Sequence, residues 1–295
     1  MEKLKNYLKL IRVKHYLKNF LVFAPLLFSG KFFEGPLFLN TLFAFIAFSF
    51  VASVVYIIND IRDVEKDRLH PIKKNRPIAS GKVSKAEGII LAIILFVIAM
   101  SINWLIKPTP VSFGILLAYL VMNIAYSFGL KNIPIIDILI LSIGFLLRVF
   151  YGAVILNLPV SNWLYLTILS ISFYLGLGKR RNEIDRSKDS RKVLEQYNRE
   201  FLDKNMYMCL ALTIMFYSLW CVDPINSSRF SGLNYLLFTV PIAMIICMKY
   251  SLDIEGDSFG DPVDVVFSDK VILILIAIYA LCVFLLLYIF PIFIH

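Results

Sequence analysis

Three oxygen-bearing side chains recur at every fourth position after a long apolar stretch: Asn59, Asp63 and Asp67. A helix turns about 100° per residue, so side chains at i, i+4 and i+8 lie on one stripe. Carboxylates stacked in this way repel each other unless a positive charge compensates them. Mg²⁺ prefers such oxygen ligands and usually completes its shell with water and phosphate oxygens. The spacing therefore predicts a site for a Mg²⁺-bound diphosphate, and we call these three residues the acidic ladder.

Basic residues follow the acidic ladder directly. Three of them are suited to phosphate oxygens: Lys73, Lys74 and Arg76. Asp60 lies one position off the stripe and is an alternative or supporting ligand, whereas Glu65 points away. The competing interpretation is a solvated helix end whose acids are neutralised at i+3 and i+4 spacing by the bases among them: Arg62, Lys66 and Arg68.

The pattern Asn-Asp-x-x-Asp-x-x-x-Asp over 59–67, followed by Arg-Pro-Ile-Ala-Ser-Gly over 76–81, resembles the first aspartate-rich motif of the UbiA superfamily of intramembrane prenyltransferases. This resemblance implies an all-α integral membrane fold. In that fold a bundle of nine transmembrane helices encloses a lipid-accessible cavity, and cytoplasmic loops cap it. The resemblance also implies a transferase that acts on a Mg²⁺-bound diphosphate.

The segment 177–197 distinguishes branches of this superfamily. Typical members carry a second aspartate-rich motif there, but this chain is mostly basic, with the patterns Gly-Lys-Arg-Arg-x-Glu-Ile and Arg-Lys-x-Leu-x-x-Tyr. These patterns, together with the segments 12–28, 126–148 and 261–270, resemble the phosphoribosyltransferase branch. The resemblance implies transfer of a 5-phosphoribosyl group from 5-phosphoribosyl 1-diphosphate to a polyprenyl phosphate, with release of diphosphate.

Two other functions stay open. One is transfer of a polyprenyl group from its diphosphate to an aromatic or glycerol-phosphate acceptor, against which the weak acidity of 177–197 argues. The other is a non-catalytic transporter or lipid-binding membrane protein. Inverted repeats with broken helices would favour a transporter, and the sequence shows no convincing repeat.

A phosphoribosyl donor and a phosphate acceptor bring more negative charge than a prenyl donor, so extra bases are expected in the site. We expect phosphate oxygens to be bound by Lys18 and by the cluster Lys179, Arg180 and Arg181, and we expect Glu183 to orient a hydroxyl of the donor. We expect a catalytic set that combines the ladder with one helix end: Asn59, Asp63, Asp67, Lys179, Arg180 and Glu183. We expect a substrate-binding set with these members: Lys18, Asn19, Arg76, Tyr126, Lys131, Arg148 and Arg181. The competing interpretation of the helix end is membrane anchoring, with Lys179 paired to Glu183 and Arg181 to Asp185 at i+4.

The elements that must position these residues are membrane helices. The 295 residues are 59% hydrophobic and 17% charged, and the mean hydropathy is +0.76. A span needs about 20 apolar residues. Nine runs qualify, and we expect them in one domain, 1–295: about 17–33, 37–58, 86–106, 110–128, 134–156, 162–178, 205–222, 232–250 and 271–292. The first run contains charges and Pro25, so eight helices plus a surface segment is the alternative.

Charge predicts the orientation. The N-terminus is rich in lysine without a cleavage site for a signal peptide, so we expect it in the cytoplasm. The basic loops 62–85 and 179–204 then fall on the same side. The net charge of +9 follows from this asymmetry and from attraction to anionic lipid headgroups, so no nucleic-acid partner is expected. The oligomeric state stays open, a homo-oligomer included.

Two charges are expected inside the membrane. Asp137 and Arg148 lie in one predicted span, about 16 Å apart by helical rise, so they cannot bond each other. A lone charge there is unfavourable by about 2.5–3.5 kcal/mol or more. Each must therefore have a partner or face a water-filled cavity, and Arg148 is a candidate to bind a lipid phosphate or an acid from another helix. The four cysteines and three histidines show no metal-binding spacing.

Overall fold

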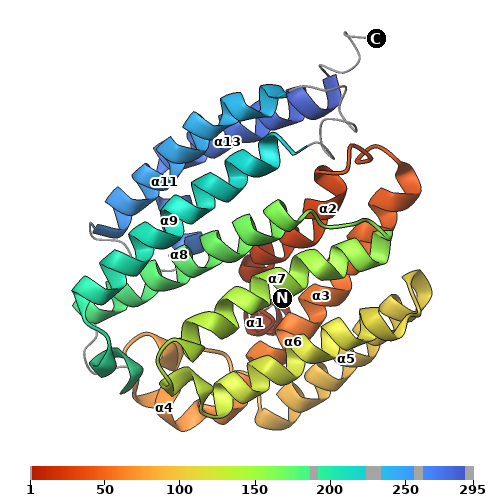
Figure 1. Ribbon diagram of the computed structural model, residues 1–295. Helices are drawn as coiled ribbons and strands as arrows, with labels where there is room; N and C mark the ends of the chain where they lie inside the picture. The colour runs from red at the N-terminus through yellow and green to blue at the C-terminus, as the bar shows by residue number, and fades with distance from the viewer. Residues whose placement is uncertain (1, 187–191, 224–233, 256–261, 290–295) are drawn as a thin grey trace. The chain divides into compact units, whose positions relative to one another are not determined.

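The structure is a computed structural model that describes residues 2–186, 192–223, 234–255 and 262–289. Regular secondary structure within these ranges is helical throughout, as Figure 1 shows. The chain forms two compact units. The first comprises Met1–Leu26, Phe32–Leu130 and Leu147–Leu158, and the second comprises Leu27–Lys31, Lys131–Leu146 and Pro159–His295.

Helices make up most of the residues that the structure describes. In the first half of the chain they are α1 (Glu2–Leu10), η1 (Val13–Phe23), α2 (Ala24–Leu27), α3 (Gly35–Arg62), α4 (Val64–Leu69), η2 (Lys73–Asn75), α5 (Lys85–Ile106), α6 (Pro110–Phe128) and η3 (Leu130–Asn132). In the second half they are α7 (Ile136–Leu156), α8 (Asn162–Arg186), η4 (Lys192–Gln196), α9 (Arg199–Cys221), η5 (Asn234–Thr239), α11 (Val240–Glu255), α12 (Pro262–Ser268), α13 (Lys270–Phe284) and η6 (Leu285–Ile289).

Eight helical segments coincide with predicted spans. Six are long and apolar enough to cross a membrane: Gly35–Arg62, Lys85–Ile106, Pro110–Phe128, Ile136–Leu156, Tyr235–Glu255 and Lys270–Ile289. The helices α8 and α9 have 25 and 23 residues and coincide with two more. The first predicted span, 17–33, is not a continuous α-helix, because it comprises the end of η1, the four residues of α2 and a non-helical segment after Leu27. The all-α membrane fold is confirmed, but the count of nine helices is not.

Local sequence explains where helices begin. Ser84 and Glu87 form a capping box at the start of α5, in which the Glu87 N–H donates to Ser84 Oγ at 3.1 Å. Thr109 caps α6 ahead of Pro110 in its first turn. Asp269 accepts from the backbone N–H groups of Val271 and Ile272 and so caps α13. These side chains satisfy backbone donors that have no partner within the helix.

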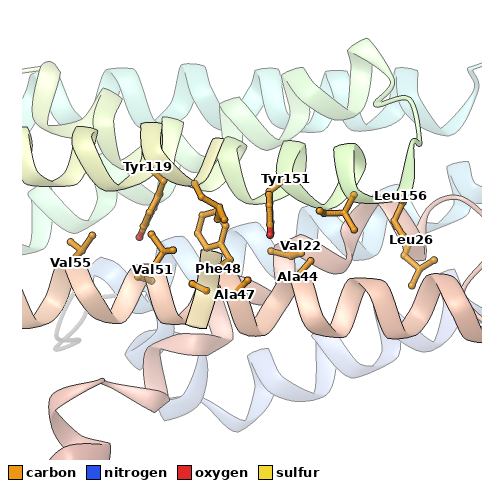
Figure 2. Close-up of a cluster of buried hydrophobic side chains, with 14 residues drawn as sticks. Val22, Leu26, Ala44, Ala47, Phe48, Val51, Val55, Tyr119, Tyr151 and Leu156 are labelled. Atoms are coloured by element: carbon orange, nitrogen blue, oxygen red, sulfur yellow. The ribbon is translucent and has the colours of Figure 1, made fainter. Parts of the chain in front are cut away.

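One face of α3 forms the core of the first unit. Figure 2 shows Phe48 and Val51 of this face directed towards Tyr119 of α6 and Tyr151 of α7. The ring centroids of Phe48 and Tyr119 are 4.7 Å apart, and those of Phe48 and Tyr151 are 5.8 Å apart. This aromatic packing holds α3, which carries the acidic ladder at its end, against two neighbouring helices.

A polar stripe on α3 binds the N-terminal segment. The Asn19 amide donates to Ser49 Oγ at 2.9 Å, and the Tyr16 hydroxyl lies 2.8 Å from Ser53 Oγ. Ser53 also contacts the carbonyl oxygen of Ile11 at 2.9 Å. Because apolar helices in lipid gain little from burial, such hydrogen bonds are an effective way to attach this segment. These hydrogen bonds give a physical reason why the 3₁₀ helix η1 lies alongside α3.

Gly152 allows η1 to approach α7 closely. A Cβ at this position would lie 2.0 Å from the carbonyl oxygen of Val22, which belongs to the backbone and cannot rotate away. We expect Gly152→Ala to lower the free energy of unfolding by about 3 kcal/mol or more. Thermal unfolding of the purified protein measures this. Gly114→Ala in α6 is the matched control, because no atom lies within 4 Å of its added Cβ, and it should be neutral or stabilising. Equal melting temperatures for both variants would contradict the close approach.

Candidate active site

The acidic ladder crosses a joint between two helices. The helix α3 ends at Arg62, Asp63 has φ −89° and ψ 11°, and α4 begins at Val64. The Asp63 N–H still donates to the Asn59 carbonyl at 2.9 Å, and the Asp67 N–H donates to the Asp63 carbonyl at 2.8 Å. These bonds preserve the i, i+4 spacing through the joint. The predicted stripe is therefore retained, although one uninterrupted helix was expected.

Neighbouring segments fix two members of the ladder. Asn59 Oδ1 accepts a hydrogen bond from the Ser127 hydroxyl near the end of α6. Asp67 Oδ2 accepts from the Arg76 guanidinium at 2.6 Å. Asn59 and Asp63 are half-buried and Asp67 is buried. The competing interpretation expected a solvated helix end. The structure instead shows side chains of the ladder that are half-buried or buried and held by neighbouring residues.

Asp60 is buried beside the ladder between two arginines. Its Oδ1 atom lies 2.6 Å from Arg12 and 3.2 Å from Arg76, and its side chain is 2% exposed. Arg76 also binds Asp67, so the four charges alternate in sign from Arg12 to Asp67. In this structure Asp60 holds Arg76 next to the ladder. From the sequence, Asp60 was expected to be an alternative or a supporting ligand. Its contact with Arg76 agrees with a supporting role.

Glu65 takes no part in this array. Its side chain is 73% exposed and contacts Arg68 at 3.3 Å. The prediction that it points away is confirmed.

The donor set of the ladder fits Mg²⁺. Within the ranges that the structure describes, no group of three or more His, Cys, Asp and Glu side chains gathers as a metal site. The ladder offers two carboxylates and one amide oxygen, and Mg²⁺ is commonly held by one or two carboxylates while phosphate oxygens and water complete its shell. Arg76 already places a cation against Asp67, which shows that positive charge is accommodated there.

Asn19 and Arg148 meet in the first unit although 129 residues separate them. The Arg148 Nε–H donates to Asn19 Oδ1 at 2.8 Å, and a second guanidinium N–H donates to the Tyr119 hydroxyl at 3.1 Å. The guanidinium carbon also lies 5.0 Å from the ring centroids of Phe48 and Tyr119. Arg148 thus has partners, as predicted, but these two are a neutral amide and a hydroxyl, whereas a lipid phosphate or an acid from another helix was expected. Contact of Asn19 or Arg148 with substrate stays a prediction.

Three further predicted substrate-binding residues are half-buried. Lys18 precedes Asn19 in η1. Tyr126 lies in the last turn of α6, next to the residue that contacts Asn59. Lys131 belongs to η3. Their contact with substrate stays a prediction.

The basic end of α8 lies in the second unit and is paired with acids. Arg180 is fully buried and contacts Asp137 at 2.6 Å and Glu183 at 2.5 Å. Arg181 is buried too and contacts Asp203 at 2.5 Å and Glu255 at 3.8 Å. Lys179 is half-buried. The two arginines therefore do not behave as solvated membrane anchors. The side chain of Asp185, the expected partner of Arg181, lies outside the described residues.

A glycine brings this end of α8 close to its neighbours. A Cβ on Gly178 would lie 2.8 Å from the side chain of Ile254 in α11 and 3.4 Å from that of Met206 in α9. The absence of a side chain at Gly178 therefore lets the following basic residues reach acids on other elements, among them Asp203 and Glu255.

Asp137 has the buried partner that the sequence required. Its Oδ2 atom binds Arg180, and its Oδ1 atom accepts from the Tyr197 hydroxyl at 2.7 Å. The sequence did not identify either partner. The energetic cost of burying a charge predicts that a partner exists, but it does not predict which residue that partner is. The Tyr that ends the Arg-Lys-x-Leu-x-x-Tyr pattern was the available signal for Tyr197.

Known proteins match this chain over most of its length. Residues 20–257 match the model of the UbiA prenyltransferase family, and this chain belongs to that family. It is an integral membrane protein. Two relatives are named decaprenyl-phosphate phosphoribosyltransferase. The one from Corynebacterium glutamicum is 32% identical over 97% of this chain and 88% of its own length. The one from Mycobacterium tuberculosis is 32% identical over 90% of this chain and 89% of its own length.

Solved structures share the fold. A UbiA homologue from Archaeoglobus fulgidus bound to GPP and Mg²⁺ matches with a TM-score of 0.70 and 17% identity, over 96% of this chain and 99% of the homologue. A structure of digeranylgeranylglyceryl phosphate synthase matches with a TM-score of 0.66 and 22% identity, over 97% of this chain and 99% of the synthase. At these identities the likeness shows the fold alone.

Proposed function

We propose that this protein transfers a 5-phosphoribosyl group from 5-phosphoribosyl 1-diphosphate to a polyprenyl phosphate. The carrying observation is the similarity to the relatives named decaprenyl-phosphate phosphoribosyltransferase, which extends over 97% of the chain in one case. In this reaction the bond from C1 of the ribose to the diphosphate oxygen breaks, and the diphosphate leaves with the electron pair. An oxygen of the acceptor phosphate forms the new bond to C1.

The acidic ladder is the proposed site for the leaving group. Asn59, Asp63 and Asp67 would hold Mg²⁺, which neutralises the charge that develops on the departing diphosphate. Arg76 lies 2.6 Å from Asp67 and adds a second positive charge for a phosphate oxygen. The Mg²⁺ in a homologous structure supports this choice of metal.

The remaining bases neutralise the phosphates of donor and acceptor in this proposal. Lys18, Lys179 and Arg181 contact phosphate oxygens. The substrates are further oriented by Asn19, Tyr126, Lys131 and Arg148. Arg180, which was expected to bind phosphate oxygens too, is instead fully buried between Asp137 and Glu183. It therefore acts through Glu183 in this proposal, and the carboxylate of Glu183 orients a hydroxyl of the donor. The acceptor phosphate is ionised at neutral pH, so it requires no strong general base.

Orientation and organisation belong to the same proposal. All 295 residues act as one membrane-embedded domain, with the N-terminus and the loops that carry the site in the cytoplasm, as the distribution of Lys and Arg favours. The polyprenyl tail runs along apolar helix faces into lipid.

Prenyl transfer is the second candidate, and a relative supports it. A digeranylgeranylglyceryl phosphate synthase from Saccharolobus solfataricus is 29% identical over 59% of this chain and 56% of its own length. The acidic ladder suits either donor, because both lose a diphosphate from a carbon that becomes cation-like. The more extensive match to the phosphoribosyltransferases favours the first candidate.

The identity of the donor separates the two candidates. Purified protein in detergent with Mg²⁺ receives radiolabelled 5-phosphoribosyl 1-diphosphate with a polyprenyl phosphate. In parallel it receives a prenyl diphosphate with hydroxybenzoate or with a glycerol phosphate. We expect a radiolabelled lipid only from the first mixture, and none after addition of EDTA. Product only from a prenyl mixture would overturn the proposed donor.

A further inference from the structure

Four side chains of the second unit form a continuous chain of contacts. The Tyr197 hydroxyl donates to Asp137 Oδ1 at 2.7 Å, Asp137 Oδ2 accepts from Arg180 Nε at 2.6 Å, and Arg180 Nη1 donates to Glu183 Oε2 at 2.5 Å. Asp137 contacts a different partner with each of its oxygens. The chain therefore connects the residue that follows η4 with a carboxylate on α8.

Burial differs along this chain. The side chains of Asp137 and Arg180 are both 0% exposed, whereas that of Glu183 is 19% exposed. Burial also raises the pKa of Tyr197, so its hydroxyl stays protonated at neutral pH and remains a donor to Asp137. Two carboxylates, those of Asp137 and Glu183, share the guanidinium of Arg180. Glu183 is the partly exposed carboxylate of the two, so it is the one suited to meet a substrate.

The backbone before α7 is held by the same tyrosine. Ile135 has φ 69°, a conformation that is rare for a β-branched residue. Its N–H donates to the Tyr197 hydroxyl at 2.6 Å. Strained residues of this kind persist only where their surroundings fix them, and they gather at functional sites. Tyr197 thus fixes both the backbone that leads into α7 and the first acidic group on that helix.

Apolar contacts dock η4 independently of the hydroxyl. Val193 and Leu194 are buried in the core of the second unit, together with the ring of Tyr197, which stacks on Phe201 with centroids 6.0 Å apart. Removal of the hydroxyl alone should therefore leave the segment docked. Its role can be tested without detaching η4.

We infer that Tyr197 and Asp137 are positioning residues that act through Arg180 to fix the carboxylate of Glu183. In this account Arg180 is itself a positioning residue, and Glu183 is the member of the chain that meets the substrate. The inference rests on the proposed function, because it concerns the hydroxyl of the donor that Glu183 orients there. It adds residues from η4 and α7 to the site, and it explains why a fully buried arginine lies in a segment otherwise suited to phosphate.

Removal of one hydroxyl tests this inference. We expect Tyr197→Phe to lower kcat about 10- to 10²-fold, because a small displacement of an orienting group has effects of this size. Tyr174→Phe is the matched control. Tyr174 is buried in the same core, and its hydroxyl contacts Ser251 and the Cys247 carbonyl rather than the chain. Both variants should lose similar thermal stability, but Tyr174→Phe should keep the wild-type kcat.

A double-mutant cycle then identifies Glu183 as the target. If Tyr197 acts through Glu183, Tyr197→Phe should lower kcat no further in a Glu183→Gln background. Glu183→Asp replaces Glu183→Gln if the latter has no measurable activity. Independent, multiplicative losses would overturn the inference, as would wild-type kcat in Tyr197→Phe or an equal loss in Tyr174→Phe.

Failure of the proposed function would look different. In that case the wild-type protein itself would transfer no phosphoribosyl group and would use a prenyl diphosphate instead. The same cycle would then be measured with that donor. Wild-type kcat for Tyr197→Phe with the donor in use would contradict the positioning role, whichever donor that is.

Discussion

Asp63→Asn is expected to lower kcat/KM about 10³-fold while the protein stays folded. The substitution keeps the size of the side chain and removes one of the two carboxylates of the ladder. A metal ion contributes several kcal/mol of charge stabilisation in such a transition state, and about 4 kcal/mol corresponds to about 10³-fold in rate. Steady-state transfer assays over a range of Mg²⁺ concentrations measure the loss. Thermal unfolding verifies the fold.

Glu65→Gln is the matched control for this substitution. Glu65 lies two residues from Asp63, and its exposed side chain contacts Arg68 outside the ladder. It should retain wild-type activity and the wild-type requirement for Mg²⁺. Full activity in Asp63→Asn, or an equal loss in Glu65→Gln, would remove the ladder from the mechanism.

Asp60→Asn is expected to destabilise the protein by about 3 kcal/mol or more. Asp60 is the buried carboxylate between Arg12 and Arg76, so its neutralisation leaves two partly buried cations near each other, of which only Arg76 keeps a contact with another acid, Asp67. Removal of one partner of a buried ion pair typically lowers stability by about 3–5 kcal/mol. Chemical or thermal unfolding in detergent measures the change. Arg76 would then rely on Asp67 alone, so we also expect weaker Mg²⁺ dependence rather than a complete loss of activity.

A second substitution shows whether the effect comes from uncompensated charge. Arg12→Gln in the Asp60→Asn background removes one of the two cations and should restore part of the stability. Glu65→Gln again serves as the surface control, with a change within about 0.5 kcal/mol. Wild-type stability of Asp60→Asn combined with loss of Mg²⁺ binding would mean that Asp60 is a metal ligand instead.

Periodicity predicted the parts of this protein that depend on neighbouring residues in the chain. Hydropathy located the long helices, and the spacing of Asn59, Asp63 and Asp67 predicted one stripe because each step spans about one helical turn. The cap at Asp269 is a local feature of the same kind, because this residue directly precedes the apolar run of α13. The joint at Asp63 escaped prediction, since the same i, i+4 backbone bonds form across it.

Contacts between distant segments were beyond the reach of these patterns. The cost of a buried charge predicted that Asp137 and Arg148 must each have partners. It did not identify Arg180 and Tyr197 for the first, nor Asn19 and Tyr119 for the second, because those pairings depend on how the helices pack. Periodicity relates side chains within one helix, and it carries no information about contacts between different helices.

The first predicted span departs from a continuous α-helix for a related reason. Its composition is apolar enough for a helix, but Tyr16 and Asn19 find partners on a polar stripe of α3. Gly152 also lets the backbone of this segment approach α7. Tertiary contacts of this kind override the preference of an apolar run for a continuous α-helix.

Binding of the donor tests the central claim most directly. The claim is that the acidic ladder holds a divalent ion on the diphosphate of 5-phosphoribosyl 1-diphosphate. Calorimetric titration of that compound into the purified protein is carried out with Mg²⁺, with EDTA, and with Asp63→Asn. The account predicts saturable binding by the wild-type protein in Mg²⁺ and none in the other two cases. Equal binding in EDTA, or binding of geranyl diphosphate without binding of the phosphoribosyl donor, would contradict it.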